Sequence, residues 1–211
     1  MYELFYYPGN ASMAPHFVLE DIGAPFVLRL VDRKTNRQKA PDYMRLNPMG
    51  RIPTLLDGER IVFESAAICL HLADRHPDAG LAPGVGTADR AHLYQWLMFL
   101  TNTLQPDFMA FFYPEQHTVD AAGVAAVRAS AAARLAAAYA VVDEALGGTG
   151  PYLLGGTPSI ADFYLLMLTI WGRWLPDPPR KLARVRCCVD LISGRASVQR
   201  ALASEGLDLH Y

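Results

Sequence analysis

The chain has 211 residues, of which 52% are hydrophobic, and its formal net charge at pH 7 is −2. A chain of this length and apolar content can bury a full core, either as one large domain or as two small ones. Because lysine and arginine are not in excess, the composition argues against binding to nucleic acids or to anionic membranes. We also expect no apolar run of transmembrane length.

Cysteine usage and the N-terminus indicate the cellular compartment. Cys69, Cys187 and Cys188 include no CxxC pair, and adjacent cysteines are poorly placed to bridge each other. We therefore expect no disulfide framework and no metal site, with all three thiols reduced and filling apolar positions. The first ten residues lack the basic region of a signal peptide. These features together predict a cytoplasmic protein.

The first part of the chain has the pattern of alternating strands and helices. In order, we expect a strand over residues 2–7, a helix over 13–23, a strand over 26–30, an irregular polar segment over 32–46, two short strands over 54–56 and 61–63, and a helix from Ser65. Ser12 is a natural N-cap for the first helix, and Gly23 stops it. Asp57-Gly58 is a strong hairpin signal. A strand, a helix and a strand in succession predict a parallel pair with a right-handed crossover.

Strand patterns cease after the Pro- and Gly-rich residues 78–86, which we interpret as a linker. The remaining elements are all helical: one carries Leu93, Leu97, Leu100 and Leu104 and should be kinked or ended by Pro106, one spans 119–146 and ends at Gly147-Gly148, one follows Ser159, and two span 180–193 and 196–205. Ser159 and Asp162 form a capping box before a helix that is apolar all round and therefore central. The sequence predicts an α/β domain over 1–77 and an all-helical domain over 87–211.

The most informative stretch runs from Asn47 to Ser65, NPMGRIPTLLDGERIVFES. It combines a turn, a hairpin and the start of a helix. An exposed strand edge beside a serine at a helix N-terminus is suited to an extended peptide that ends in a carboxylate. The Asn-Pro-x-Gly-x-Ile-Pro motif ends at Pro53, eleven residues before Glu64, and it resembles the glutathione-binding half of the glutathione S-transferase superfamily. The resemblance extends over nearly the whole chain.

This resemblance implies a thioredoxin-like first domain and a role for several residues. In the family, the proline equivalent to Pro53 follows a cis peptide bond, and the backbone at Ile52 pairs with the cysteinyl part of glutathione. The N–H and hydroxyl of Ser65 would hold the γ-glutamyl carboxylate, and Glu64 would orient the amine; helix capping is compatible with the first role. Lys39, fourteen residues before Pro53, matches a lysine that holds the glycine carboxylate in some classes. An ordinary surface charge is the alternative for Lys39, and Arg51 and Gln38 lie close enough in sequence to replace or assist it.

The reaction of this family needs glutathione as a thiolate. A free thiol with a pKa of about 8.5 is only about 3% ionised at pH 7. One hydrogen bond to the sulfur beside a helix N-terminus is enough to lower that pKa by two units, which costs about 2.7 kcal/mol, so no general base is required. The residue that donates this hydrogen bond is therefore expected in the turn between the first strand and the first helix.

Three residues of that turn are candidates for activating the thiol, and we rank them Ser12, Asn10 and Tyr6. Each has an ordinary structural alternative, as a cap, a turn residue or a packed aromatic. The segment resembles the SPG-x-C-S-x-x-P-H pattern of the bacterial beta-type transferases, but Ala11 stands where those proteins carry cysteine. No protein thiol is then left to form a mixed disulfide, which argues against glutaredoxin-type chemistry.

The resemblance implies a homodimeric transferase that conjugates glutathione, its co-substrate, to a small hydrophobic electrophile, with no metal. The electrophile should bind between the domains, where aromatic or soft side chains are available from Tyr94, Met98, Gln105, Phe112, Tyr113 and Trp171. Two alternatives remain open at this point. One is a glutathione-dependent isomerase or dehalogenase, and the other is a non-catalytic binding protein with the same fold.

Overall fold

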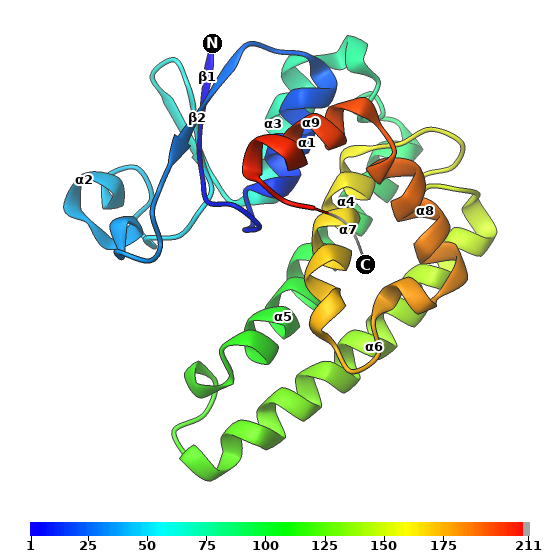
Figure 1. Cartoon of the computed structure of the whole chain (residues 1–211). Helices are drawn as coiled ribbons and strands as arrows, with labels where there is room; N and C mark the ends of the chain where they lie inside the picture. The colour runs from blue at the N-terminus through cyan, green and yellow to red at the C-terminus, as the bar shows by residue number, and fades with distance from the viewer. Residues whose placement is uncertain (209–211) are drawn as a thin grey trace. The chain divides into compact units, whose positions relative to one another are not determined.

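The computed structural model describes residues 1–208, which form two compact units. The first unit contains Met1–Ala82 together with the C-terminal residues from Ser193 onward, and the second contains Pro83–Ile192. The last helix, α9 (Ala196–Glu205), belongs to the first unit because it packs on α1 (Met13–Ile22) (Figure 1). The domain limits predicted from the sequence place residues 196–205 in the helical domain over 87–211. The two units are described separately below.

The first unit is built on a four-stranded mixed sheet with the order β2-β1-β3-β4. Its strands are β1 (Tyr2–Tyr6), β2 (Phe26–Leu30), β3 (Thr54–Asp57) and β4 (Arg60–Phe63). The predicted parallel pairing of β1 and β2 is confirmed, and β3 pairs antiparallel with both β1 and β4. Asp57 pairs with Arg60, so the hairpin loop is Gly58-Glu59, one residue later than predicted. Gly58 has a φ of 60°, which explains why glycine is favoured there.

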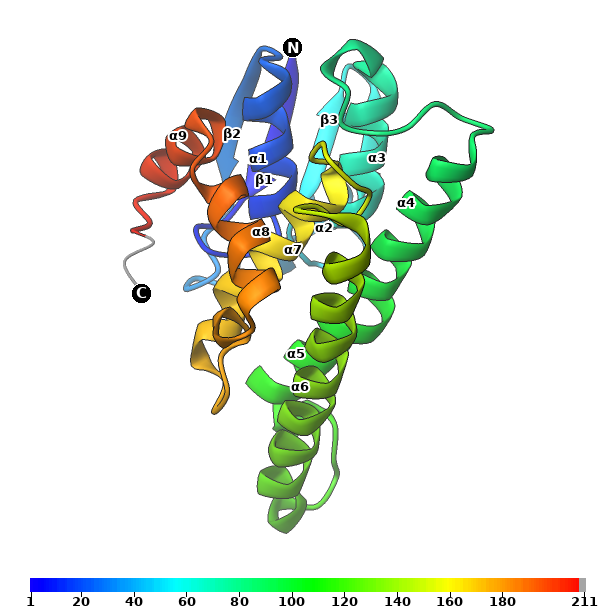
Figure 2. The same cartoon turned by 90° about the vertical axis from the view of Figure 1, so that its right-hand side faces the viewer.

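Helices α1 and α3 (Ser65–Arg75) cover one face of this sheet, and the short α2 (Pro41–Met44) lies on the other (Figures 1 and 2). The main core, between the sheet and α1 and α3, contains fully buried Leu4, Phe17, Leu55, Ile68 and Leu72.

A smaller cluster beneath α2 contains Val31, Tyr43 and Ile52. A mixed sheet with these helices is the predicted thioredoxin-like arrangement. Its small second core fixes the segment that leads into β3.

The second unit is helical. Its α-helices are α4 (Ala88–Phe99), α5 (Gln105–Phe112), α6 (Val124–Thr149), α7 (Ile160–Trp171) and α8 (Ala183–Ser193). Every residue of α7 is buried, as its apolar sequence predicts. The Ser159–Asp162 capping box at its start is also confirmed. Short 3-10 turns connect the elements of the chain: η1 (Arg37–Lys39), η2 (Pro77–Ala79), η4 (Pro114–Gln116), η5 (Ala121–Gly123), η6 (Gly172–Trp174) and η7 (Pro179–Lys181).

Several helix boundaries differ from the sequence-based expectation. Helix α6 begins at Val124 and not at residue 119, and α8 begins at Ala183 and not at residue 180, because a 3-10 turn precedes each of them. A π-helical segment, η3 (Leu100–Leu104), lies between α4 and α5, because the wider turn accommodates Pro106, which cannot donate a backbone hydrogen bond. The helix therefore continues past the proline in a new register. Helix α6 also continues through Gly147-Gly148 to Thr149, and Gly150 with a φ of 113° ends it. A Cβ at Gly147 would lie 2.8 Å from Nε of Arg184, so this glycine allows close packing inside the helix.

Two expectations drawn from composition differ from the structure: that no apolar run reaches transmembrane length, and that all three cysteines are buried. Helix α6 with its preceding turn, Ala121–Thr149, is long and apolar enough to span a membrane by length and hydropathy alone. A single helix of this kind is weak evidence, and Arg134 of α6 pairs with Asp107 of α5 inside the helical unit. Cys69 and Cys188 are buried as expected, but Cys187 is exposed, because adjacent residues of a helix such as α8 point about 100° apart.

Candidate functional site

The turn that joins β1 to α1 is held together by its own backbone and by Ser12. The N–H of Asn10 donates to the carbonyl of Tyr7 at 3.1 Å. The hydroxyl of Ser12 donates to the same carbonyl at 3.2 Å and accepts the Tyr7 N–H at 3.3 Å. Ser12 is fully buried and its backbone is helical, so its side chain points back toward the strand and does not cap α1. The predicted side-chain cap was therefore wrong, because a capping serine needs an extended backbone.

Asn10 and Tyr6 are placed differently from Ser12. Both are partly exposed. The Oδ1 atom of Asn10 accepts the N–H of Ala11 at 2.8 Å, and the amide NH₂ of Asn10 makes no hydrogen bond within the described residues 1–208. The ring of Tyr6 lies on the α1 side of the sheet, with its centroid 6.4 Å from the ring of His16. Asn10 and Tyr6 thus each have a donor group that the turn does not use, but only Asn10 belongs to the turn, since Tyr6 is the last residue of β1.

Helix α9 supports the same turn through Glu205. One carboxylate oxygen of Glu205 accepts the N–H of Gly9 at 2.9 Å, and the other lies 2.7 Å from Nδ1 of His16. The side chains of His16 and Glu205 are 0% and 1% exposed. Sequence reasoning missed Glu205, because 196 positions separate it from Gly9. No local pattern signals a contact over that distance.

The segment before β3 is fixed by hydrogen bonds to a single carbonyl. The carbonyl of Arg51 accepts the hydroxyl of Tyr43 at 2.7 Å and Nδ2 of Asn47 at 2.9 Å. Burial raises the pKa of Tyr43, so its hydroxyl stays a donor at neutral pH. The peptide bond between Ile52 and Pro53 is cis, which confirms the expectation from the family resemblance. Tyr43 is a second residue whose role the sequence did not reveal.

Gly50 allows the backbone before the cis-proline to lie in close contact with Gln38 and Lys39. It has a φ of 56°, and a Cβ on it would lie 2.8 Å from both the carbonyl oxygen of Gln38 and Cδ of Lys39. The ammonium group of Lys39 donates to the carbonyl of Met49 at 3.0 Å. Lys39 and Arg51 are both exposed. The structure therefore places two cationic side chains beside the cis-proline segment, on the solvent side.

The start of α3 connects to the first turn. The hydroxyl of Ser65 donates to the carbonyl of Ala11 at 2.8 Å, and Ser65 is 5% exposed. Glu64 is exposed and has a φ of 71°. A non-glycine residue in the left-handed region costs of order 1–3 kcal/mol, and such strain clusters at functional sites. The first N–H groups of α3 have no partner inside the helix and carry its positive dipole.

The predicted glutathione-binding residues of the first unit thus converge on one region. The β3–β4 ladder ends at the Thr54–Phe63 pair, so Ile52 and Pro53 lie beyond the paired part of the sheet. The Ser65–Ala11 hydrogen bond places the N-terminus of α3 beside the turn that leads into α1. An extended ligand could therefore bind an unpaired backbone segment, two helix N-termini and the cations of Lys39 and Arg51. These groups suit a short peptide with two carboxylates.

A thioredoxin-like unit with a cis-proline before β3 and a serine at the start of α3, combined with an all-helical unit, defines the glutathione-transferase class of folds. The chain belongs to the glutathione S-transferase family. Residues 1–74 match the glutathione S-transferase N-terminal domain, and residues 125–176 match its C-terminal domain.

Known proteins resemble the chain over its full length. Glutathione S-transferase GST-4.5 of Xanthomonas campestris is 34% identical over 207 residues, covering 98% of this chain and all of that protein. Glutathione S-transferase GstA of Escherichia coli O157:H7 is 30% identical, covering 97% of this chain and 99% of that protein. Among solved structures, a sphingomonad glutathione S-transferase in complex with glutathione has a TM-score of 0.85 and 31% identity, covering 98% and 100% of the two chains. The glutathione S-transferase of Xylella fastidiosa has a TM-score of 0.89 and 28% identity, covering 99% and 100%.

Proposed function

We propose that this protein is a glutathione transferase that ionises glutathione and conjugates it to a small hydrophobic electrophile. The observation that carries the proposal is the hydrogen bond between Ser65 and Ala11, which joins the N-termini of α1 and α3 next to the cis-proline segment. The sphingomonad relative was solved with glutathione, which supports the same ligand here. Isomerisation or dehalogenation would use the same bound thiolate with a different second substrate.

The tripeptide is bound in an extended conformation in this proposal. The N-terminus of α3, with Ser65 and Glu64, takes the γ-glutamyl end, because helix N-termini favour carboxylates. The backbone of Ile52 pairs with the cysteinyl residue as an added strand. Lys39 and Arg51, both exposed beside Gly50, attract the glycine carboxylate. Each end of the ligand thus meets charge of the opposite sign.

Asn10 is the proposed activator of the thiol. The amide NH₂ of Asn10 donates to the sulfur beside the N-terminus of α1, and a hydrogen bond to a charged group contributes about 1.5–3 kcal/mol. The helix dipole adds about 0.3–1 kcal/mol. Together these terms match the roughly 2.7 kcal/mol that a two-unit decrease in pKa requires. Ser12 ranks below Asn10 because its hydroxyl is buried and already bonded to Tyr7.

A cytoplasmic homodimer is the proposed form of the protein. In the first unit, Met49, Ile61 and Phe63 are exposed on and beside the edge strand β4. In the second unit, Tyr94 and Met98 are exposed at i and i+4 on α4. Exposed apolar side chains grouped on regular elements are typical of protein–protein interfaces. A second copy of the chain is the partner that these surfaces are proposed to bind.

Binding to immobilised glutathione, followed by a conjugation assay with a chlorodinitrobenzene, tests the proposal. We expect retention of the wild type, elution by free glutathione, and turnover. The Ser65→Ala variant should bind glutathione about two- to tenfold more weakly, because it loses the hydrogen bond to the Ala11 carbonyl, worth about 0.5–1.5 kcal/mol, that holds the start of α3 against the turn before α1. Ser130→Ala, at an exposed serine of α6, is the matched control. Failure of the wild type to bind would refute the proposal, and binding without turnover would leave a non-catalytic protein.

A further inference from the structure

Glu205 makes one contact that the packing of α9 on α1 does not require. Helix α9 is already joined to α1 by two further ion pairs, Arg195–Asp21 and Arg200–Glu20. Glu205 is the last residue of α9, and one of its carboxylate oxygens accepts the N–H of Gly9 at 2.9 Å. Gly9 lies in the turn between β1 and α1, outside both elements. The carboxylate therefore fixes the turn in addition to the helix.

The residue that Glu205 holds stands next to the proposed activator of the thiol. Gly9 precedes Asn10, whose N–H donates to the carbonyl of Tyr7 at 3.1 Å. Gly9 has a φ of 71°, in a region that glycine enters freely and from which it can also leave freely. The hydrogen bond to Glu205 holds the Gly9 backbone in this one conformation. The direction of the Asn10 side chain therefore depends on a carboxylate from the other end of the chain.

The carboxylate of Glu205 is itself held from a second side. Its other oxygen lies 2.7 Å from Nδ1 of His16, and Nε2 of His16 lies 3.4 Å from the hydroxyl of Ser204. The side chains of His16 and Glu205 are both buried. Hydrogen bonds in such a water-poor environment are stronger than exposed ones, and a fully satisfied buried network is rigid. Glu205 can therefore hold the turn in a fixed place.

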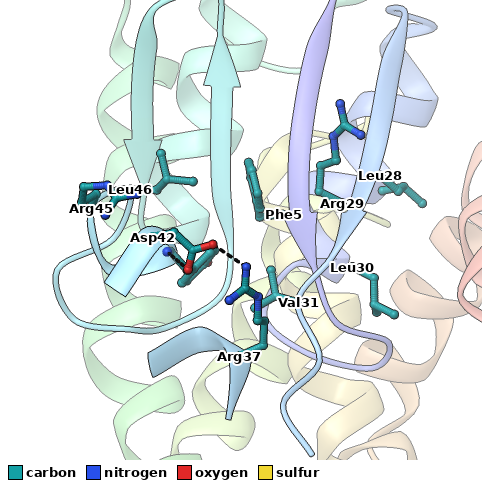
Figure 3. Close-up of a pocket in the computed structure, with 10 residues that line it drawn as sticks. Phe5, Leu28, Arg29, Leu30, Val31, Arg37, Asp42, Arg45 and Leu46 are labelled. Carbon is teal, nitrogen blue, oxygen red and sulfur yellow. Dashed lines mark hydrogen bonds and ion pairs between the residues drawn. The ribbon is translucent and has the colours of Figure 1, made fainter. Parts of the chain in front are cut away.

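Aromatic packing fixes His16 in turn. Successive residues of a strand point to opposite faces of the sheet. Phe5 lines the pocket on the α2 side of the sheet (Figure 3), so Tyr6 faces α1. The ring centroids of Tyr6 and Phe26 lie 6.4 Å and 5.6 Å from that of His16. The contact between α9 and the turn is therefore anchored in the core of the first unit.

We infer that Glu205 is a positioning residue for the proposed reaction: it fixes the N–H of Gly9 and thereby keeps the amide NH₂ of Asn10 directed at the sulfur of glutathione. The inference rests on the proposed function and adds a residue of the C-terminal helix to it. Glu205 is not proposed to contact glutathione, because its two oxygens are used by Gly9 and His16. Without this contact, the tripeptide would still bind through Ser65 and the segment before β3, but its thiol would ionise less.

Ultraviolet titration of bound glutathione in Glu205→Ala tests the inference. This variant lacks the acceptor for Gly9, so the pKa of the bound thiol should rise by about one unit from its lowered value in the wild type. A rise of that size reduces the ionised fraction at pH 6.5 about fivefold, and kcat for a chlorodinitrobenzene should fall by the same factor. At pH 9 both thiols are ionised, so kcat should differ less than about twofold. A loss of folded protein alone would lower kcat equally at both pH values.

Two further variants separate the position of the turn from the stability of the fold. Glu205→Gln keeps an oxygen that can accept the N–H of Gly9, so the pKa of the bound thiol should stay within about half a unit of the wild type. Arg195→Gln is the matched control, because it removes the ion pair with Asp21 at the opposite end of α9. It should leave the pKa of the bound thiol unchanged.

Hydrogen exchange of the wild type tests the same coupling without any variant, and it decides the matter if Glu205→Ala does not fold. If a docked α9 favours bound glutathione, then glutathione must favour the docking of α9 to the same extent. Saturating glutathione should slow exchange in residues 196–205 at least about threefold more than in α8.

The outcomes distinguish this inference from the proposed function. A wild-type thiol that titrates like free glutathione would refute the proposed function. A lowered pKa in the wild type that Glu205→Ala leaves unchanged, an equal effect of Arg195→Gln, or exchange in α9 that glutathione does not slow would each overturn the role of Glu205 alone.

Discussion

Asn10 and Ser12 lie two positions apart in one turn, yet their side chains are used differently. Ser12 is buried and closes the turn through the backbone of Tyr7, whereas Asn10 accepts a hydrogen bond with its oxygen and has an NH₂ group without a partner in the described residues 1–208. A serine hydroxyl that is already satisfied gains little by turning to a ligand. The activating group is therefore expected to be the amide.

Replacing Asn10 by alanine should lower kcat/KM for a chlorodinitrobenzene about 10- to 150-fold, because the variant loses one hydrogen bond to the thiolate. Ser12→Ala and Tyr6→Phe should change the same quantity less than about threefold when their folded fractions are matched by circular dichroism. Initial rates at pH 6.5, where little free thiol is ionised, give the clearest contrast. If Ser12→Ala were the most impaired variant, the assignment to Asn10 would fail.

Tyr43 is not proposed to contact glutathione. Its hydroxyl donates to the carbonyl of Arg51 and so positions the backbone that is proposed to bind the ligand. Tyr43→Phe removes one of the two donors to that carbonyl and loosens the segment that contains Ile52. One neutral hydrogen bond contributes about 0.5–1.5 kcal/mol, so the dissociation constant for glutathione should rise about two- to tenfold. Tyr139→Phe, at a buried tyrosine of the helical unit, should leave that constant unchanged. Calorimetric titration of both variants decides whether Tyr43 positions the site.

At the scale of elements, helix α9 is joined to the rest of the first unit by the carboxylate of Glu205. Glu205 binds both Gly9 and His16, so it joins the end of the chain to the turn that precedes α1. The contact is fully buried, which makes it costly to break. The C-terminal helix is thus part of the support for the candidate site.

Glu205→Gln should reduce the free energy of unfolding by about 2–4 kcal/mol, because a buried charged acceptor is replaced by a neutral one. Arg200→Gln is the matched control on the same helix. Its ion pair with Glu20 leaves the arginine side chain 57% exposed, and exposed pairs contribute at most about 1 kcal/mol. Urea denaturation at constant pH measures both. Equal stability of the two variants would show that the buried contact contributes little.

Local signals explain what the sequence could predict about these elements. The Asp57-Gly58 turn, the Ser159–Asp162 box and the alternation of strands and helices up to Ser65 each depend on neighbouring residues, and the structure bears them out apart from one-residue shifts. The Glu205–Gly9 contact and the hydrogen bonds from Tyr43 to Arg51 depend on tertiary packing. The orientation of the Ser12 side chain was missed for a different reason, since the local backbone angles of the turn decide it and residue type alone does not reveal them.

At the scale of the whole molecule, the proposed homodimer would cover the apolar side chains of β4. Sedimentation equilibrium should give a mass of twice the 23.2 kDa of the chain. The double variant Ile61→Glu and Phe63→Glu should shift that mass toward one chain, because two charges then face the partner at an apolar contact. Val141→Glu and Leu191→Glu, at exposed apolar positions of α6 and α8, are the control. A monomeric wild type would refute the dimer.

The central claim is that bound glutathione loses its proton at neutral pH. Ultraviolet difference titration of the complex measures this directly, since the thiolate absorbs where the thiol does not. We predict an apparent pKa of the bound thiol about two units below the ordinary value of 8.5, and a pKa closer to that value in Asn10→Ala. A bound thiol that titrates like free glutathione in the wild type would contradict the account.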